Sequence, residues 1–248
     1  MRIVYVHGIG QQCTKETLKD HYNRSLFGST STPCVTRMVY WAAPTDPPLP
    51  PDAADDTSGR FSFLKSLHLN GQPKIPRAIA SIGTWLGFRK LEVYATKRIT
   101  SKYIPEVADY LYNEQTRSRF DLKFSKELDF HGPNIVIAHS LGSVIAYHAL
   151  ANISTARVKL FLTVGSPIGL FAFQDAIGPI SRPSSVDHWL NIAERTDPVA
   201  IDADLTDDGP GIENFCGVGI STTAPEHPHA VEGYLRSAIV RAAVRGAL

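Results

Sequence analysis

Short apolar runs alternate along the chain with longer amphipathic stretches, and this alternation predicts the fold class. A strand that is buried on both faces of a sheet reads as a continuous apolar run of about four to eight residues. Strands that alternate with helices indicate a mostly parallel sheet covered by helices on both faces, which is the α/β class. The runs that we interpret as strands are 2–6, 35–41, 134–138, 158–164 and 188–193, with one more short strand at 213–219.

The amphipathic stretches predict helices, and two of them have clear limits. The first is expected to begin after Thr14, which can cap it, and to end before Gly28, because glycine is common just past a helix. The last is expected to be one continuous helix at the carboxyl end of the chain, because its apolar residues recur with helical spacing. Further helices are expected from Pro105 and over 116–129. The apolar residues of the last helix are Val231, Tyr234, Leu235, Ala238, Ile239 and Ala242.

One segment interrupts the alternation of strands and helices. Residues 42–60 are rich in proline and aspartate, which is typical of an irregular excursion. Two apolar-rich stretches follow, FSFLKSLHL and IPRAIASIGTWLGFRKL, and two glycines interrupt the second. We therefore expect a single domain over residues 1–248, with a cap-like insertion at about 45–100.

Composition narrows the classes of function. The formal net charge of +1 gives no reason to expect a nucleic-acid partner. The three cysteines, at 13, 34 and 216, are widely spaced, so we expect neither a disulfide framework nor a metal site. No run of about 18 apolar residues occurs, and the first residues turn polar too soon for a signal peptide. We expect a cytoplasmic chain with no integral membrane segment and no cofactor.

Residues 134–150, NIVIAHSLGSVIAYHAL, place one serine between an apolar strand and an apolar-faced helix. The sequence around Ser140 approximates the nucleophile elbow G-x-S-x-G, with Ala138 in the place of the first glycine and Gly142 in the second. Small residues at these positions permit a tight turn that exposes a hydroxyl at a helix N-terminus. A serine that only caps the helix is the simpler interpretation, but the strand and helix on either side favour the elbow.

A serine hydroxyl attacks only when a base removes its proton, and the base needs an acid to orient it. In a sheet that carries a nucleophile elbow, the acid and then the base follow the serine along the chain. Asp197 follows a predicted strand and is our candidate acid, with Asp202 in reserve. His229 is the preferred base because it lies next to the last helix, and His227 is the alternative.

An oxyanion hole requires two backbone N–H groups that converge on the substrate oxygen. Leu141, the residue after the serine, supplies the first. The second is expected from the loop that follows the first strand, His7-Gly8-Ile9-Gly10, where glycines allow close approach. Ile9 is the preferred donor and Gly10 the next.

The motifs YVHGIG, AHSLGS and VGSP, together with Asp197-Pro198-Val199 and the two histidines 227 and 229, resemble the α/β-hydrolase superfamily. The greatest likeness is to bacterial lipase- or esterase-like serine hydrolases, and it covers about 1–41 and 103–248. The resemblance implies Ser140 as nucleophile, Asp197 as acid and His229 as base. It also implies Ile9 and Leu141 as the oxyanion hole. Ala138 departs from the strict motif, and the insertion lies earlier than the lid of many members.

The expected function is hydrolysis of a carboxylic ester, on a small-molecule or lipid-like substrate, through an acyl-enzyme. Thioesterase, amidase or acyltransferase chemistry would use the same residues. A catalytically silent binding or regulatory module is the alternative from another class of protein. A nucleotide-binding protein is a minor third interpretation, because GIG follows a strand but the complete G-x-G-x-x-G pattern is missing.

Overall fold

The fold is described from a computed structural model of the chain. The described residues are 1–8, 13–40, 110, 113–170, 173–174, 177–197, 199–200, 203–205, 208–217, 219 and 228–248. The expected insertion at 45–100 lies outside the described residues. So does the helix expected from Pro105, apart from Tyr110.

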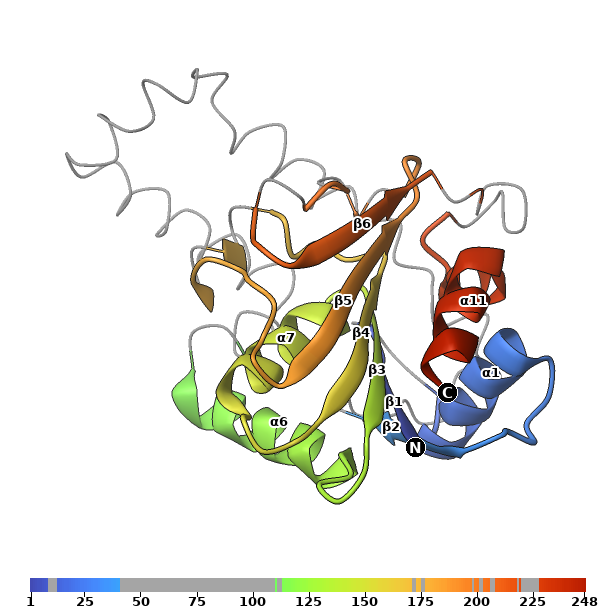
Figure 1. The fold of residues 1–248 in the computed structure, drawn as a ribbon, viewed down its shortest axis with the longest axis horizontal. Helices are drawn as coiled ribbons and strands as arrows, with labels where there is room; N and C mark the ends of the chain where they lie inside the picture. Colours follow the sequence, from blue (N-terminus) through green and yellow to red (C-terminus); the bar gives the residue numbers. More distant parts are fainter. Residues whose placement is uncertain are drawn as a thin grey trace.

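The described residues form one six-stranded sheet in which every neighbouring pair of strands is parallel (Figure 1). The strand order is β2-β1-β3-β4-β5-β6. This confirms the α/β class and the predicted strands, of which 2–6 and 158–164 have the predicted limits. The strands are β1 Arg2–Val6, β2 Val35–Val39, β3 Asn134–His139, β4 Val158–Val164, β5 Val186–Ala193 and β6 Ile212–Cys216.

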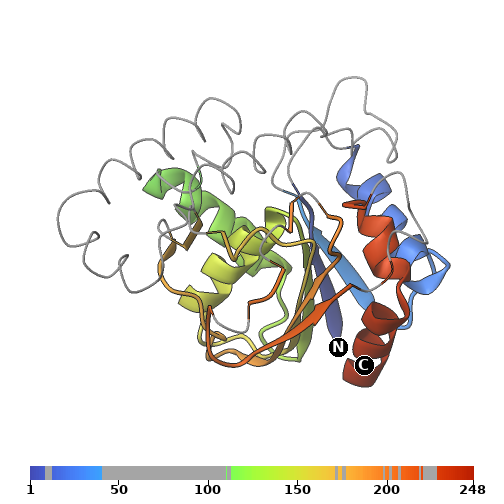
Figure 2. The ribbon, with the colours of Figure 1, turned by 90° about the horizontal axis from the view of Figure 1, so that it is seen from above.

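Helices cover both faces of the sheet, as Figure 2 shows from above. Helices α6 and α7 pack on one face, and α1, α10 and α11 lie on the other. Both faces of the central strands are therefore removed from water, which explains why the strands read as unbroken apolar runs. The helices are α1 Lys15–Phe27, α6 Glu114–Glu127, α7 Gly142–Asn152, α10 Val231–Arg236 and α11 Ala238–Ala247.

Helix α1 begins and ends where the sequence predicted. The Thr14 side chain accepts a hydrogen bond from the Thr17 N–H at 3.3 Å, which satisfies one of the unpaired donors of the first turn. Gly28 takes a left-handed conformation at φ 78°, and its N–H donates to the Arg24 carbonyl at 2.8 Å. Both ends of this helix are thus encoded locally.

The prediction of one continuous carboxyl-terminal helix is wrong. The chain breaks at Ser237, which has an extended conformation with ψ 145° and separates α10 from α11. The Ser237 hydroxyl donates to the Tyr234 carbonyl at 2.7 Å and accepts from the Val240 N–H at 3.4 Å. A serine side chain can replace helical backbone bonds in this way. The apolar spacing continues across the break, so periodicity alone did not reveal it.

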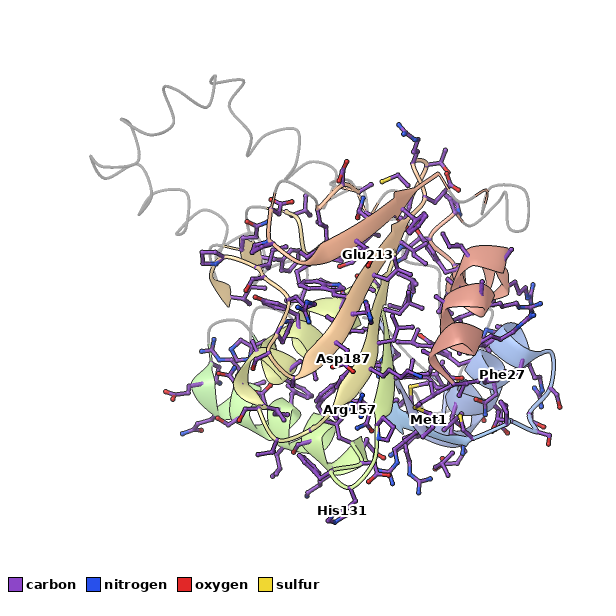
Figure 3. The ribbon with its side chains drawn as sticks, in the orientation of Figure 1. Met1, Phe27, His131, Arg157, Asp187 and Glu213 are labelled. Atoms are coloured by element: carbon purple, nitrogen blue, oxygen red, sulfur yellow. The ribbon has the colours of Figure 1, made fainter. Side chains whose placement is uncertain are left out.

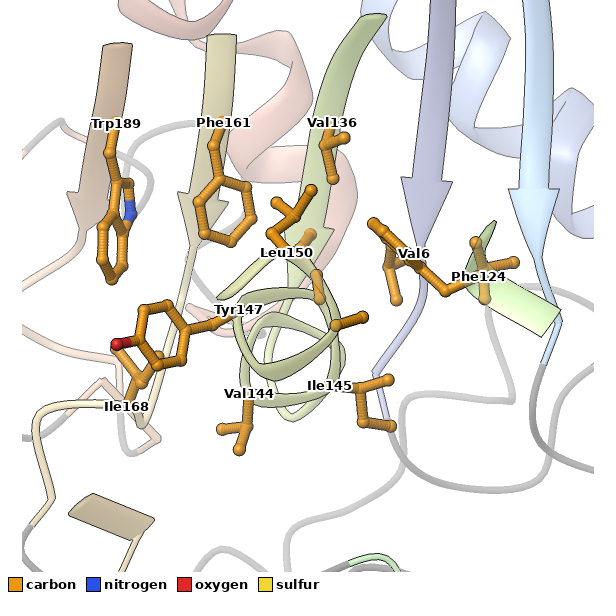
Figure 4. Close-up of a cluster of buried hydrophobic side chains, with 14 of the residues drawn as sticks. Val6, Phe124, Val136, Val144, Ile145, Tyr147, Leu150, Phe161, Ile168 and Trp189 are labelled. Atoms are coloured by element: carbon orange, nitrogen blue, oxygen red, sulfur yellow. The ribbon is translucent and has the colours of Figure 1, made fainter. Parts of the chain in front are cut away.

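The face beneath α7 is filled by large side chains from adjacent strands (Figure 4). Trp189 of β5 packs against both Phe161 of β4 and Tyr147 of α7, with ring centroids 5.2 and 5.3 Å away. Burial of each such side chain contributes about 1.5–3 kcal/mol. This packing anchors α7, and with it the turn that precedes the helix.

Parallel strands bring all their carboxyl ends to one edge of the sheet. The chain passes from β1 to β2 on one side, and β3 lies on the other side of β1. Ligands of open α/β sheets bind where the strand order reverses in this way, outside the carboxyl ends. The carboxyl ends of β1 and β3 are therefore where we expect a site.

At the opposite edge of the sheet, Arg157 and Asp187 lie side by side and form an exposed ion pair at 3.4 Å (Figure 3).

We predict that Gly142→Ala destabilises the protein, because the entry into α7 has no room for a methyl group. A Cβ at this position would lie 2.2 Å from the His7 carbonyl oxygen and 2.8 Å from that of Val6. The collision is with backbone, so we expect a loss of about 1–3 kcal/mol in the free energy of unfolding, measured by urea titration.

Gly246→Ala is the matched control for this substitution. Gly246 is an exposed residue of α11, and nothing outside its own helical backbone lies within 4 Å of the position that a Cβ would take. Alanine should leave the stability unchanged or raise it by up to about 1 kcal/mol. Equal stabilities of the two variants would contradict the close approach of Gly142 to β1.

Candidate active site

Ser140 lies in a strained turn between β3 and α7. With φ at 55°, it is the one non-glycine residue in the described part of the chain that has a left-handed conformation. Such a conformation costs about 1–2 kcal/mol for a residue with a Cβ. Its N–H donates to the Val164 carbonyl at 3.1 Å, so the turn remains tied to β4. Strain of this kind persists where the surrounding structure imposes it, and it is concentrated at functional sites.

The loop after β1 contacts this turn directly. The sheet register pairs Val6 with Ala138, which brings Gly8 next to Ser140. A Cβ on Gly8 would lie 2.9 Å from the Cβ of Ser140. Because Gly8 and Gly142 have no side chains, the strained turn and the start of α7 can pack closely against the end of β1 and the loop that follows it.

The Ser140 hydroxyl does not cap α7. The N-cap is Leu141, which makes no side-chain capping bond, and Ser140 Oγ has no hydrogen-bond partner among the described residues. The helix-capping interpretation is therefore wrong. The expectation that the hydroxyl is exposed is also wrong, because Ser140 is 2% exposed. A buried hydroxyl without a partner is costly, so it calls for an explanation other than stability.

His229 and Asp197, which the sequence placed in separate loops, form a buried pair. His229 Nδ1 lies 2.9 Å from Asp197 Oδ1 and 2.8 Å from Oδ2. The Asp197 side chain is fully buried, and that of His229 is 8% exposed. The two residues follow β5 and β6, so the carboxyl edge of the sheet brings them together. This geometry fixes which imidazole nitrogen carries the proton toward the carboxylate.

The Asp197 carboxylate accepts hydrogen bonds from several other groups. Oδ1 accepts from the Val199 N–H at 2.8 Å and the Ala200 N–H at 3.3 Å. Oδ2 accepts from the Tyr234 hydroxyl at 2.6 Å. Burial alone would raise the pKa of Asp197, but His229 and these donors outweigh it and hold the pKa below its usual value. Asp197 is therefore ionised at neutral pH.

His139, the residue before Ser140, connects the turn to this pair. Its ring packs on the His229 ring with centroids 4.6 Å apart and planes 30° apart. Its Nε2 lies 2.9 Å from the His229 carbonyl oxygen, which can only accept, so Nε2 carries a proton and donates it. Burial, followed by the charge of His229, lowers the pKa of His139 to about 3. A neutral imidazole thus supports both the ring and the backbone of His229.

The three predicted catalytic residues are not joined by one continuous chain of hydrogen bonds. The acid and base are in contact, and Ser140 adjoins the residue that packs on the base. Ser140 Oγ makes no hydrogen bond to His229 in this structure. Catalytic hydrogen bonds are often long without substrate and shorten in the complex.

The remaining candidates divide into two groups. Leu141 directly precedes α7, and no described residue accepts a hydrogen bond from its N–H. The preferred second oxyanion donor Ile9, and its alternative Gly10, lie outside the described residues, as do His227 and Asp202.

Sequence reasoning missed three residues that shape the site. Tyr234 was assigned only to a helix face, and His139 only to the turn. Gly165, in the motif VGSP, has φ 56°, and a Cβ there would lie 2.8 Å from Asp197 Oδ2 and 3.2 Å from His229 Cε1. The glycine was a visible signal for a close approach, whereas nothing in the local sequence marks the contacts of the other two.

The described residues contain no cluster of three or more histidine, cysteine, aspartate or glutamate side chains able to hold a metal ion. Within the same residues, no helix has the length and hydropathy needed to span a membrane. No protein-family model, curated protein or solved structure matches the chain.

The buried histidines predict a loss of stability in acid. Burial lowers the pKa of His139 to about 3 and that of His7 to about 4, both below the unfolded value of 6.5. Below pH 6.5 the unfolded chain binds protons that the folded chain does not, so protonation favours unfolding. We expect the free energy of unfolding, measured by urea titration, to fall by about 1.4 kcal/mol per pH unit for each histidine between pH 6 and 4.5.

His139→Gln should reduce this slope by the contribution of one proton, since glutamine retains an N–H donor but does not titrate. His131→Gln, at an exposed position, is the control and should leave the slope unchanged. The pKa of Asp197 is held below its unfolded value of 3.8, so its contribution to stability is lost mainly at pH values below this window. An unchanged slope in His139→Gln would contradict burial of a neutral imidazole.

Proposed function

We propose that this chain is a serine hydrolase that cleaves carboxylic esters through an acyl-enzyme. The observation that carries the proposal is the buried His229–Asp197 pair packed against the residue that precedes Ser140. A structural role does not explain a buried, hydrogen-bonded histidine–aspartate pair beside a strained serine whose hydroxyl has no described partner. Activation of that serine accounts for the strain, the burial and the paired imidazole together.

We further propose the α/β-hydrolase fold, with residues 45–100 as an inserted cap. In that fold the nucleophile, acid and base occur in this order along the chain. Ser140, Asp197 and His229 have the same order and follow β3, β5 and β6. The parallel sheet, and the sharp turn from β3 into α7, support this assignment.

In the proposed reaction Ser140 Oγ attacks the ester carbonyl while His229 Nε2 accepts the hydroxyl proton. The negative charge of Asp197 stabilises the imidazolium that forms and holds Nδ1 in place. The N–H groups of Leu141 and Ile9 bind the oxyanion, and His229 returns the proton to the departing alkoxide as the C–O bond breaks. Water then attacks the acyl-enzyme by the same steps and releases the acid.

His139 assists this charge development without reacting. Its low pKa keeps the ring neutral at the pH at which His229 must accept a proton. A second cation in van der Waals contact would oppose formation of the imidazolium. The substrate class that we propose is a small-molecule or lipid-like ester.

We predict that a fluorophosphonate probe labels the folded protein, and that Ser140→Ala abolishes the labelling. The control is Ser185→Ala, which removes another buried serine hydroxyl, one that donates to the Leu150 carbonyl at 3.4 Å. This variant should be labelled like the wild type. Absence of labelling in folded wild-type protein would instead favour a catalytically silent binding module. Intact-mass spectrometry gives the readout.

We predict that His229→Ala and Asp197→Asn each lower kcat for p-nitrophenyl esters by about 10³-fold or more, because the serine loses its base or the base loses its orientation. His227→Ala should retain activity within a few-fold. A panel of esters with graded acyl length would measure all three variants and also define the acyl preference. Loss of turnover in His227→Ala with activity retained in His229→Ala would reverse the assignment of the base.

A further inference from the structure

The side chain of Tyr234 lies against the candidate acid and is fully buried. Its hydroxyl donates to Asp197 Oδ2 at 2.6 Å and accepts from the Glu194 N–H at 3.0 Å. Helix α10, which carries Tyr234, begins two residues after His229. The same short segment therefore supplies the imidazole and a phenol, and both bind the same carboxylate oxygen.

The ring of Tyr234 is held in place by the loop that follows β4. A Cβ on Gly165 would lie 3.0 Å from Tyr234 Cε2 and 2.8 Å from Asp197 Oδ2. The bare backbone of Gly165 thus covers the phenol and the carboxylate together. With its hydroxyl also bound to the Glu194 N–H, Tyr234 is held at its ring and at both sides of its hydroxyl.

The two carboxylate oxygens of Asp197 have different partners. Oδ1 is held by the N–H groups of Val199 and Ala200, in addition to His229. Oδ2 is bound by His229 and Tyr234. Loss of the phenol hydroxyl would leave the imidazole as the one donor to Oδ2 among the contacts described, so the carboxylate would be held firmly at one oxygen only.

We propose that Tyr234 is a positioning residue of the hydrolase, which fixes Asp197 Oδ2 and through it the orientation of the His229 ring. The inference rests on the proposed function. Hydrogen bonds to a charged group are stronger than those between neutral groups, which suits the phenol to this task. Burial, followed by the charge of Asp197, raises the pKa of Tyr234 well above its usual value, so the phenol remains a donor at neutral pH.

The test is steady-state kinetics of Tyr234→Phe on a p-nitrophenyl ester that the wild type hydrolyses. The phenyl ring retains the packing, and only the hydroxyl is lost. We expect kcat to fall about 10- to 100-fold with KM within about twofold. A misoriented His229 imidazole slows the proton transfer, whereas substrate binding does not depend on its orientation. An unchanged kcat would overturn the proposal.

Tyr147→Phe is the matched control. Tyr147 is buried in α7, and its hydroxyl also accepts a backbone N–H, from Ser181 at 3.2 Å, and donates to the Pro179 carbonyl at 3.3 Å. Its loss should lower the melting temperature without changing kcat by more than about twofold. A comparable fall of kcat in both variants would show a general effect of buried phenols and would overturn the specific role.

A double-mutant cycle separates positioning from mere structural support. In an Asp197→Asn background, Tyr234→Phe should cost less than about twofold in kcat, because the charge through which the phenol acts is already gone. A full effect in that background would overturn the proposal.

If Tyr234→Phe does not fold, the wild type still provides a test by NMR. The Tyr234 hydroxyl proton and the His229 Nδ1 proton, which point at one oxygen, should give a cross-relaxation peak, and its absence would overturn the proposal.

Failure of this inference is distinguishable from failure of the proposed function. Wild-type protein that neither reacts with the fluorophosphonate nor hydrolyses any ester would refute the hydrolase and, with it, a catalytic role of Tyr234. Active wild-type protein with unaltered Tyr234→Phe kinetics would refute only the role of the phenol.

Discussion

The burial of the Asp197 carboxylate is the constraint on which the rest of the site depends. A charge removed from water is costly unless it is paired and hydrogen-bonded, and here the side chain is fully buried. Donors from its own turn, from the loop before α10 and from α10 itself converge on it. These segments must keep their relative positions for the charge to remain satisfied. The need to compensate one carboxylate therefore orders the carboxyl ends of β5 and β6 around the site.

The second constraint is steric and acts at β3. The left-handed conformation of Ser140 is tolerated because the neighbouring backbone has no side chains at Gly8 and Gly142. Gly165 has the same role beside the His229–Asp197 pair, where a Cβ would lie 2.8 Å from Asp197 Oδ2 and 3.2 Å from His229 Cε1. Both halves of the site are thus assembled by close backbone approach. Polar contacts then align the groups within the space that the glycines leave.

The helices on the face opposite α7 connect the site to the rest of the domain. His21 of α1 and Glu232 of α10 form a hydrogen bond in a partly buried position. This pair joins α10, which carries Tyr234, to the first helix of the chain. The break at Ser237 then allows α11 to pack separately, with Arg241 donating to the Ser25 carbonyl of α1 at 2.8 Å. Helix α10 is therefore tied to α1 directly through Glu232, and α11 is tied to the same helix beyond the break through Arg241.

The sequence by itself determined the strands, the limits of α1, the α/β class and the residues at which chemistry was expected, but not the break between α10 and α11. Apolar runs identified the strands, since burial on both faces requires them, and Thr14 and Gly28 marked the ends of α1 because capping is a local interaction. Ser140, Asp197 and His229 were selected from motif and chain order. Only the tertiary structure decided that Asp197 contacts His229, that Ser140 is buried, and that His139 and Tyr234 support the pair. Those contacts join residues far apart in the chain, and their distances depend on strand order and packing, which no local pattern specifies.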